Sequence, residues 1–382
     1  MNTEKLYYKN AYISEFSATV ICCEEARGIY RSVLDKSAFF PEAGGQSSDK
    51  GKIGDIEVIK VEEEGDILYH YTKTPLIVNN SYQCKLDFEE RLDKMRCHTA
   101  EHILSGILHK LYGVENTGFH LGAAEVTFDT SLVMSKEELK AVERMANEAV
   151  MRNLRVSEYY PTAEELPTLT YRSKLDLKEN VRIVYIEDTD ACACCAPHVR
   201  TTGEIGLIKI VDSVKHKGGS RITMLAGMRA FDYIQRIASE AGSVSVLLCA
   251  PPTEISVETA RLYESKNELS ARLLAKDREL ASVYARLIPA TDSSFVSVYP
   301  TLDTDALREI ANSVGDRVGG ALVLLSGEDG SYKYVIRYSG DDFKSVIACA
   351  NTALNGKGGG RAPMAQGNFA ESLDRIKEHF EK

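Results

Sequence analysis

Two short segments of this 382-residue chain carry nitrogen and sulfur donors at matching spacing. His98 and His102 are four residues apart, and so are Cys194 and His198. On a helix, side chains four residues apart lie on the same face, so His98 and His102 would present their imidazoles to one point. Three imidazoles and one thiolate form a mixed donor set that zinc binds in tetrahedral geometry. The sequence therefore predicts a zinc site that joins two distant segments.

The first pair alone is weaker evidence for a metal. It is not the zincin motif, because Glu101 directly precedes the second histidine instead of following the first. A lone pair at this spacing is often a pair of ordinary interior histidines. The later cysteine-rich segment favours the metal. Cys192 and Cys195 are extra thiols there; the spacing favours Cys194 as the ligand and leaves Cys195 as an alternative.

Two glycine-rich segments lie outside the donor segments. Gly44 and Gly45 stand directly before Gln46, and adjacent glycines allow positive φ or a close approach of the backbone to a ligand. A plain tight turn is the alternative. The segment 356–361 reads Gly-Lys-Gly-Gly-Gly-Arg and lacks the Walker spacing. Its successive amides, with two basic side chains, favour an anion nest, and a surface loop is the alternative.

The composition is that of a globular chain of about two or three domains. No apolar run approaches the ~20 residues that cross a bilayer, and the polar N-terminus lacks a signal-peptide core. The clustering of the nine cysteines suits metal chemistry better than a disulfide framework. We therefore expect a cytoplasmic protein without a membrane partner. The net charge of −10 argues against indiscriminate coating of nucleic acid, but it allows a local basic patch.

The hydrophobic patterns predict an α+β, multidomain chain of four segments. Residues 1–87 form a β-barrel, 88–228 an α+β domain with the zinc site, 229–289 a helical linker and 290–382 an α/β domain. In the first segment, β-like runs are Thr19–Ile21, Ile53–Ile59 and Asp66–His70.

In the second segment, the pattern predicts helices over Arg91–Tyr112, with Gly113 as the stop, and from Ser135 to about Met151. It also predicts a loop over Thr117–Gly122 and strands over Val126–Phe128, Val181–Ile186 and Leu207–Val211.

The third segment is helical, is broken at Ala250–Pro252, and carries a heptad-like row of leucines. The last contains a helix over Thr304–Val314 and strands near 296–298, 321–325 and 332–338.

Taken together, the motifs resemble a known family. His98–His102 and Cys194–Gly206 are similar to the editing domain of alanyl-tRNA synthetases and its freestanding relatives. Phe39–Gln46, followed by Asp49 and Gly51, resembles the glycine-rich motif of that family's N-terminal barrel. Gly356–Gln366 resembles the C-terminal domain that these synthetases share with DHH-type phosphoesterases. We expect no aminoacylation domain before the barrel, so the resemblance implies the long, freestanding form.

This sequence departs from the family pattern at three places. Asp35-Lys36-Ser37 has serine where the family has threonine. Ala43 stands where many members carry a third glycine, and Ala196-Pro197 replaces the usual small-residue link before the last histidine.

The resemblance implies a zinc-dependent hydrolase that deacylates Ser-tRNA(Ala), Gly-tRNA(Ala) or both, and that forms a homodimer through its C-terminal region. It assigns catalytic roles to Ser37 and Gln46, substrate contacts to Gly44, Gly45 and His120, and tRNA contacts to Lys357, Gly358, Gly359, Gly360 and Arg361. Gln46→Ala is expected to spare zinc binding and to lower turnover. Four protein donors would close a tetrahedral site, whereas catalytic zinc usually keeps one position open. Zinc could therefore activate water or orient the substrate.

Two other functions remain open. One is a non-catalytic tRNA-binding protein in which zinc only stabilises the fold. The other is an editing hydrolase for another mischarged tRNA, since threonyl-tRNA synthetases use a related editing fold. The sequence leaves the choice between serine and glycine undecided.

Overall fold

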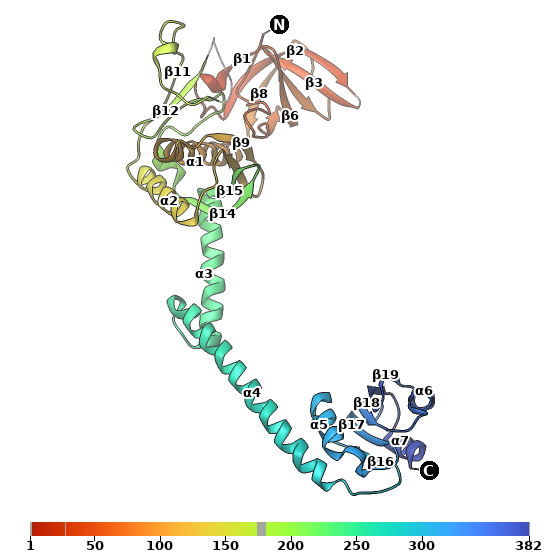
Figure 1. Ribbon diagram of the computed structural model, residues 1–382. Coiled ribbons are helices and arrows are strands. Elements are labelled where there is room, and N and C mark those ends of the chain that lie inside the picture. The colour runs from red at the N-terminus through yellow and green to blue at the C-terminus, as the bar shows by residue number, and fades with distance from the viewer. Residues whose placement is uncertain (1, 27, 174–180, 382) are drawn as a thin grey trace. The chain divides into compact units, whose positions relative to one another are not determined.

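The computed structural model describes residues 2–26, 28–173 and 181–381 as a mixed α and β chain (Figure 1). It divides into two compact units, Met1–Glu240 and Ala241–Lys382. The first unit contains both of the first two predicted segments, and the three borders between the four predicted segments stay predictions. Among the helices that the structure describes, none is long and apolar enough to span a membrane.

Six strands near the N-terminus form a closed barrel in the order β2-β3-β7-β6-β5-β8. The strands are β2 (Glu15–Ala26), β3 (Ile29–Leu34), β5 (Gly51–Ile53), β6 (Ile56–Glu64), β7 (Ile67–Thr72) and β8 (Ser81–Leu86). Two further short strands, β1 (Glu4–Lys5) and β4 (Lys36–Ser37), pair in parallel. The prediction of one strand over Ile53–Ile59 was wrong. Gly54 turns the chain with a φ of +59°, and β5 and β6 pair as antiparallel neighbours.

The rest of the first unit surrounds the long helix α1 (Phe88–Tyr112). Asp87 caps its N-terminus, and Gly113 ends it in the left-handed conformation with a φ of 65°. The helix packs against α2 (Lys136–Met151), and Ser135 and Glu138 form the predicted capping box of α2. Because α1 has partners on several sides, almost every residue of its central turns is buried.

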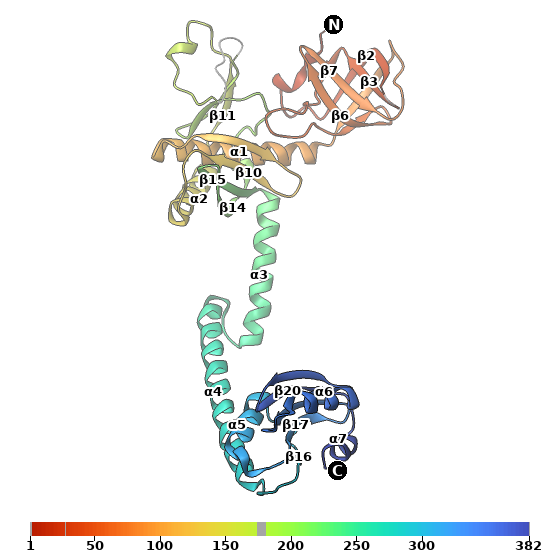
Figure 2. The same ribbon diagram turned by 45° about the vertical axis from the view of Figure 1, so that its right-hand side comes forward.

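Two sheets complete this unit (Figure 2). One has the order β14-β15-β10-β9 and the other the order β11-β12-β13. The strands are β9 (Asn116–Leu121), β10 (Val126–Thr130), β11 (Val156–Tyr159), β12 (Ile183–Ile186), β13 (Asp190–Ala193), β14 (Ile208–His216) and β15 (Gly219–Ala226). The predicted loop over Thr117–Gly122 was wrong, because most of it belongs to β9, which pairs with β10.

A buried ion pair joins the barrel to α1. The Arg91 guanidinium on α1 is fully buried and bonds the carboxylate of Asp49. It also donates to the carbonyl oxygens of Ala11 (3.0 Å) and Ala38 (2.6 Å). Removing either partner of such a pair would leave an unpaired buried charge, so this contact fixes the barrel against the helix that carries the histidines.

Helix α3 (Met228–Leu248) leaves the first unit, and the predicted break follows it at η4 (Pro252–Glu254). The second unit contains α4 (Ile255–Leu287), which carries exposed apolar side chains at Leu262, Leu269, Leu273, Leu280, Val283 and Leu287. A five-stranded sheet follows in the order β16-β17-β18-β20-β19. Its elements are β16 (Phe295–Val298), α5 (Thr304–Val314), β17 (Leu322–Glu328), β18 (Ser331–Arg337), α6 (Phe343–Ala353), β19 (Lys357–Arg361), β20 (Met364–Phe369) and α7 (Leu373–Phe380).

The glycine-rich C-terminal segment is neither a loop nor a nest. Lys357–Arg361 is the exposed edge strand β19, paired with β20. Gly358 and Gly360 approach the β20 backbone so closely that an added Cβ would lie 2.5 Å from the Gln366 carbonyl oxygen or 2.2 Å from that of Met364. In an extended strand, successive amides point to opposite sides, so they do not converge on one anion.

Candidate metal centre

The four predicted ligands lie together in the first unit. The donor atoms of His98, His102, Cys194 and His198 are all within 4.8 Å of one another. The Cys194 sulfur is 3.4 Å from Nε2 of His198 and 3.7 Å from Nε2 of His98. His98 and His102 project from α1, as their spacing predicts. Cys194 and His198 lie in the irregular segment after β13, so a turn and not a helix brings these two side chains, four residues apart, to the same point.

Each imidazole of the cluster is held by its Nδ1 atom. The partners are Gln46 Oε1 for His98 (3.1 Å), Asp190 Oδ2 for His102 (3.1 Å) and Thr99 Oγ1 for His198 (3.0 Å). The Thr99 hydroxyl donates to the Met95 carbonyl, so its oxygen accepts from His198. An Nδ1–H that donates to an acceptor leaves the neutral ring with Nε2 as its free lone pair. Three fixed Nε2 atoms beside one thiol are the donor set that zinc requires.

Cys194 and His198 have the charge states expected of metal ligands. Burial opposes ionisation of the Cys194 thiol, but the His98 and His198 imidazoles hold its pKa well below the usual value. Burial lowers the pKa of His198 to about 3, which keeps this ring neutral. Burial opposes protonation of His102, but Cys192, Asp190 and Cys194 hold the pKa of this ring well above its usual value. Partial burial of its sulfur, together with the neighbouring Cys194, raises the pKa of Cys195 to about 11. Of the two adjacent thiols, Cys194 is therefore the better donor.

The glycine motif closes one side of the cluster. Gly44 lies beside the imidazole of His98, where an added Cβ would be 3.8 Å from Cε1. Gly45 has a φ of +83°, and an added Cβ would lie 2.4 Å from the Phe119 carbonyl oxygen. The Leu121 amide donates to the Gly45 carbonyl at 2.8 Å, which attaches this turn to β9. Only glycine satisfies both the positive φ and the close approach at position 45.

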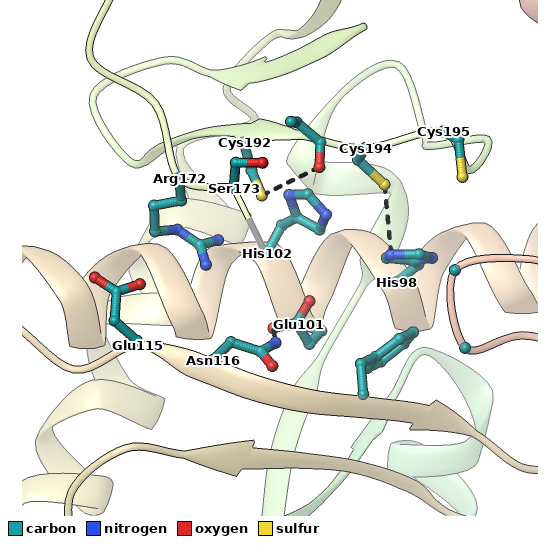
Figure 3. A pocket seen from close by; sticks show the side chains of 14 residues that line it. His98, Glu101, His102, Glu115, Asn116, Arg172, Ser173, Cys192, Cys194 and Cys195 are labelled. Carbon is teal, nitrogen blue, oxygen red and sulfur yellow. Dashed lines mark hydrogen bonds between the residues drawn. The ribbon is translucent and has the colours of Figure 1, made fainter. Parts of the chain in front are cut away.

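A pocket of about 340 Å³ opens beside the cluster (Figure 3). Its lining residues are Gly44, Gly45, His98, Glu101, His102, Glu115, Asn116, Phe119, Arg172, Ser173, Cys192, Ala193, Cys194 and Cys195. Figure 3 shows Cys194 facing His98, with Cys195 further along the same segment. A small acyl group could therefore reach three of the four donors.

The structure separates the predicted substrate residues into two groups. Gly44 and Gly45 line the pocket. Gln46 is buried and reaches His98 instead of the pocket. Ser37 points into the barrel, where its oxygen lies 2.8 Å from Nε2 of His70. His120 is exposed and does not line the pocket, whereas its neighbour Phe119 does.

Phe119 precedes His120 on β9 and lies beside the candidate metal centre. Its ring centroid lies 4.6 Å from that of His98. Adjacent side chains of a strand point to opposite faces. Phe119 and His120 therefore face opposite sides of β9, and the substrate contact that the resemblance assigns to His120 stays a prediction.

Asp190 and Arg172 were missed by sequence reasoning. Asp190 binds Nδ1 of His102 and receives two hydrogen bonds from Arg172, at 2.7 and 2.8 Å. Burial opposes ionisation, but His102 and Arg172 lower the pKa of Asp190. Gly106 allows α1 to approach, since an added Cβ there would lie 2.7 Å from Cβ of Asp190. The available signal was weak: an acidic residue four positions before the ligand cysteine.

Two parts of the chain match models of known domains. Residues 181–223 match the threonyl and alanyl tRNA synthetase second additional domain, and residues 292–382 match the DHHA1 domain. The class of protein is therefore one that combines these two domains in a single chain.

Similarity to whole proteins extends over nearly the full length. The alanyl-tRNA editing protein Aarsd1 of Rattus norvegicus is 26% identical over 396 residues, covering 97% of this chain and 95% of that protein. The alanyl-tRNA editing protein AlaX-L of Pyrococcus horikoshii is 25% identical over 406 residues, covering 99% of each. The alanine–tRNA ligase of Pyrococcus furiosus is 29% identical over 405 residues, but only 43% of that enzyme is covered. The chain is thus a relative of the freestanding alanyl-tRNA editing proteins, and the resemblance predicted from its motifs is confirmed.

Proposed function

We propose that this protein is a zinc-dependent hydrolase that removes serine, glycine or both from mischarged tRNA(Ala). The observation that carries the proposal is the pocket whose wall contains His98, His102 and Cys194, with every imidazole of the cluster fixed through Nδ1. The relatives that cover the chain almost completely are named as alanyl-tRNA editing proteins, which supports the same substrate class.

The ligand residues would hold the metal, and the pocket would hold the acyl group. Bound zinc supplies a Lewis acid that polarises an ester carbonyl. Gln46, Asp190 and Thr99 orient the three rings, and the phenyl ring of Phe119 packs beside His98. A site of about 340 Å³ with both apolar and polar walls suits a small amino acid on the terminal ribose.

The energetic need for such an enzyme follows from the limits of binding. An apolar pocket rejects an isostere with one added hydroxyl by only ~10²-fold. Serine therefore enters a site built for alanine, and a second site that hydrogen-bonds the hydroxyl can discriminate far more strongly, by ~10⁴–10⁵-fold.

The deciding experiment is deacylation of Ser-tRNA(Ala), Gly-tRNA(Ala) and Ala-tRNA(Ala) with and without a chelator. The proposal expects metal-dependent release of serine or glycine while the alanyl ester survives. If all three esters survive while the tRNA still binds, the metal is structural and the protein is a tRNA-binding protein. Equal release of seryl groups from other tRNAs would assign it to a different editing substrate.

The second unit would contribute tRNA binding and dimerisation. Lys357 and Arg361 lie at the two ends of the exposed strand β19, within the part that matches the DHHA1 domain. Replacing either with alanine should reduce the salt dependence of tRNA affinity by about one unit of log–log slope per charge. The exposed leucines of α4 provide a surface for a second copy, and a monomer mass at every concentration in sedimentation would refute dimerisation.

A further inference from the structure

Glu101 is a buried carboxylate in the wall of the pocket. Glu101 is 3% exposed and directly precedes the candidate ligand His102 on α1. Residues three and four positions apart are neighbours on a helix, with Cβ atoms about 5–6 Å from each other. Glu101 is therefore within one helical turn of His98 on the same side of the helix.

One oxygen of this carboxylate is already occupied. The Ser105 hydroxyl and the Asn116 amide nitrogen both donate to Oε1. The orientation of the Asn116 amide is fixed, because its oxygen accepts from the Gly118 backbone amide at 3.0 Å. In the part of the chain that the structure describes, the hydrogen bonds of Glu101 go to Oε1, and none involves Oε2. The carboxylate is thus anchored through one atom, and the other has no described partner in the pocket wall. Figure 3 shows Glu101 beside Asn116.

Arg172, the cation of the pocket wall, lies close enough to attract the Glu101 carboxylate, but its direct ion pair is with Asp190. Arg172 is committed to Asp190, with two hydrogen bonds of 2.7 and 2.8 Å. Lys94, on the same helix, bonds Glu90 and the backbone carbonyls of Ser47 and Ser48. A buried carboxylate that has no direct ion pair is unfavourable, and a positively charged ligand would compensate it.

An aminoacyl ester carries one positive charge, on its α-ammonium group, while the tRNA backbone is negative. The α-nitrogen is separated from the ester carbonyl oxygen by only two atoms, so one pocket can hold the nitrogen near Glu101 and the carbonyl near the donor cluster. We infer that Glu101 binds the α-ammonium group of the substrate and selects aminoacyl esters over esters that lack a free α-amino group. This inference rests on the function proposed above and names what its pocket recognises.

The test compares two esters of the same tRNA. One is seryl-tRNA(Ala); the other is its α-hydroxy analogue, in which a hydroxyl replaces the ammonium group and the side chain is retained. The measured quantity is the ratio of kcat/KM for the two esters, each divided by its rate of uncatalysed hydrolysis. Wild-type protein should prefer the seryl ester, and Glu101→Gln should reduce this preference by about 10- to 100-fold, as expected for loss of a buried charge-assisted hydrogen bond.

Glu89→Gln is the matched control, because it removes the same charge from an exposed position of α1 away from the pocket. It should retain the wild-type preference. Zinc content and thermal unfolding of each variant report whether the fold and the metal site are intact.

Three outcomes would overturn the inference. Glu101→Gln could slow both esters equally, which would show that the carboxylate acts on water or on the fold. The wild-type protein could show no preference, a result that needs no folded variant. If the wild-type protein releases neither ester, the proposed function itself fails and the inference fails with it.

Discussion

Gln46 is the residue whose expected role changes most when the structure is considered. Its motif suggested contact with the substrate, so Gln46→Ala was expected to spare zinc binding. In the structure Gln46 Oε1 accepts from Nδ1 of His98 at 3.1 Å, and both side chains are buried. We therefore predict that Gln46→Ala weakens metal binding.

The magnitude follows from the lost acceptor. The variant leaves the Nδ1–H of His98 unpaired in a buried site, at a cost of about 1–3 kcal/mol. Since ~1.4 kcal/mol is a factor of ten, affinity for zinc should fall about 5- to 150-fold. This agrees with the ~10- to 100-fold loss typical of residues that orient metal ligands. Turnover should fall chiefly through loss of metal at limiting zinc.

The assay is competition for zinc against a chromogenic chelator at constant pH. Gln46→Glu, which keeps an acceptor at the same position, should bind zinc within a few-fold of wild type, on the order of 1 kcal/mol. Gln83→Ala removes an exposed glutamine from β8 and should have no effect. Wild-type zinc affinity in a folded Gln46→Ala protein would refute the reasoning, because His98 would then be oriented without this hydrogen bond.

Three further predictions concern the thiols, the glycine turn and the barrel. Cys194→Ala should lose stoichiometric zinc while Cys195→Ala keeps it, measured by metal analysis after dialysis; equal loss would contradict the assignment. Gly45→Ala should destabilise the fold by about 3 kcal/mol in urea denaturation, because the new Cβ meets the Phe119 carbonyl at a positive φ; a change under about 1 kcal/mol would show that the turn relaxes. Burial lowers the pKa of His70 from 6.5 to about 4, so the unfolded chain binds this proton first as pH falls. The free energy of unfolding should therefore be fully retained above pH 6.5 and should decline by up to about 3 kcal/mol toward pH 4. A His70→Asn variant with an unchanged dependence of stability on pH would exclude His70 as the cause.

Much of the local structure could be predicted because it depends on neighbouring residues. Gly113 ends α1 and Ser135 begins α2 as their sequence signals indicate. The predictions were wrong where the local structure depends on pairing with another strand. Nothing local shows that the chain turns at Gly54, or that residues 357–361 become an edge strand of a sheet. The pairing of β9 with β10 also decides which side of the strand faces the pocket, and Phe119 lies in the pocket wall while His120 does not.

The sequence by itself determined which chemistry is available: three histidines and a cysteine in two pairs of fixed spacing, and glycines beside Gln46. Spacing along a helix is a local property, so His98 and His102 could be placed on one face from the sequence alone. Only the tertiary structure decided that Cys194, and not Cys195, meets them, and that Gln46, Asp190 and Thr99 orient the rings. The physical reason is that these contacts join the barrel, the long helix and the segment after β13, and only packing between distant segments brings their atoms within hydrogen-bonding distance.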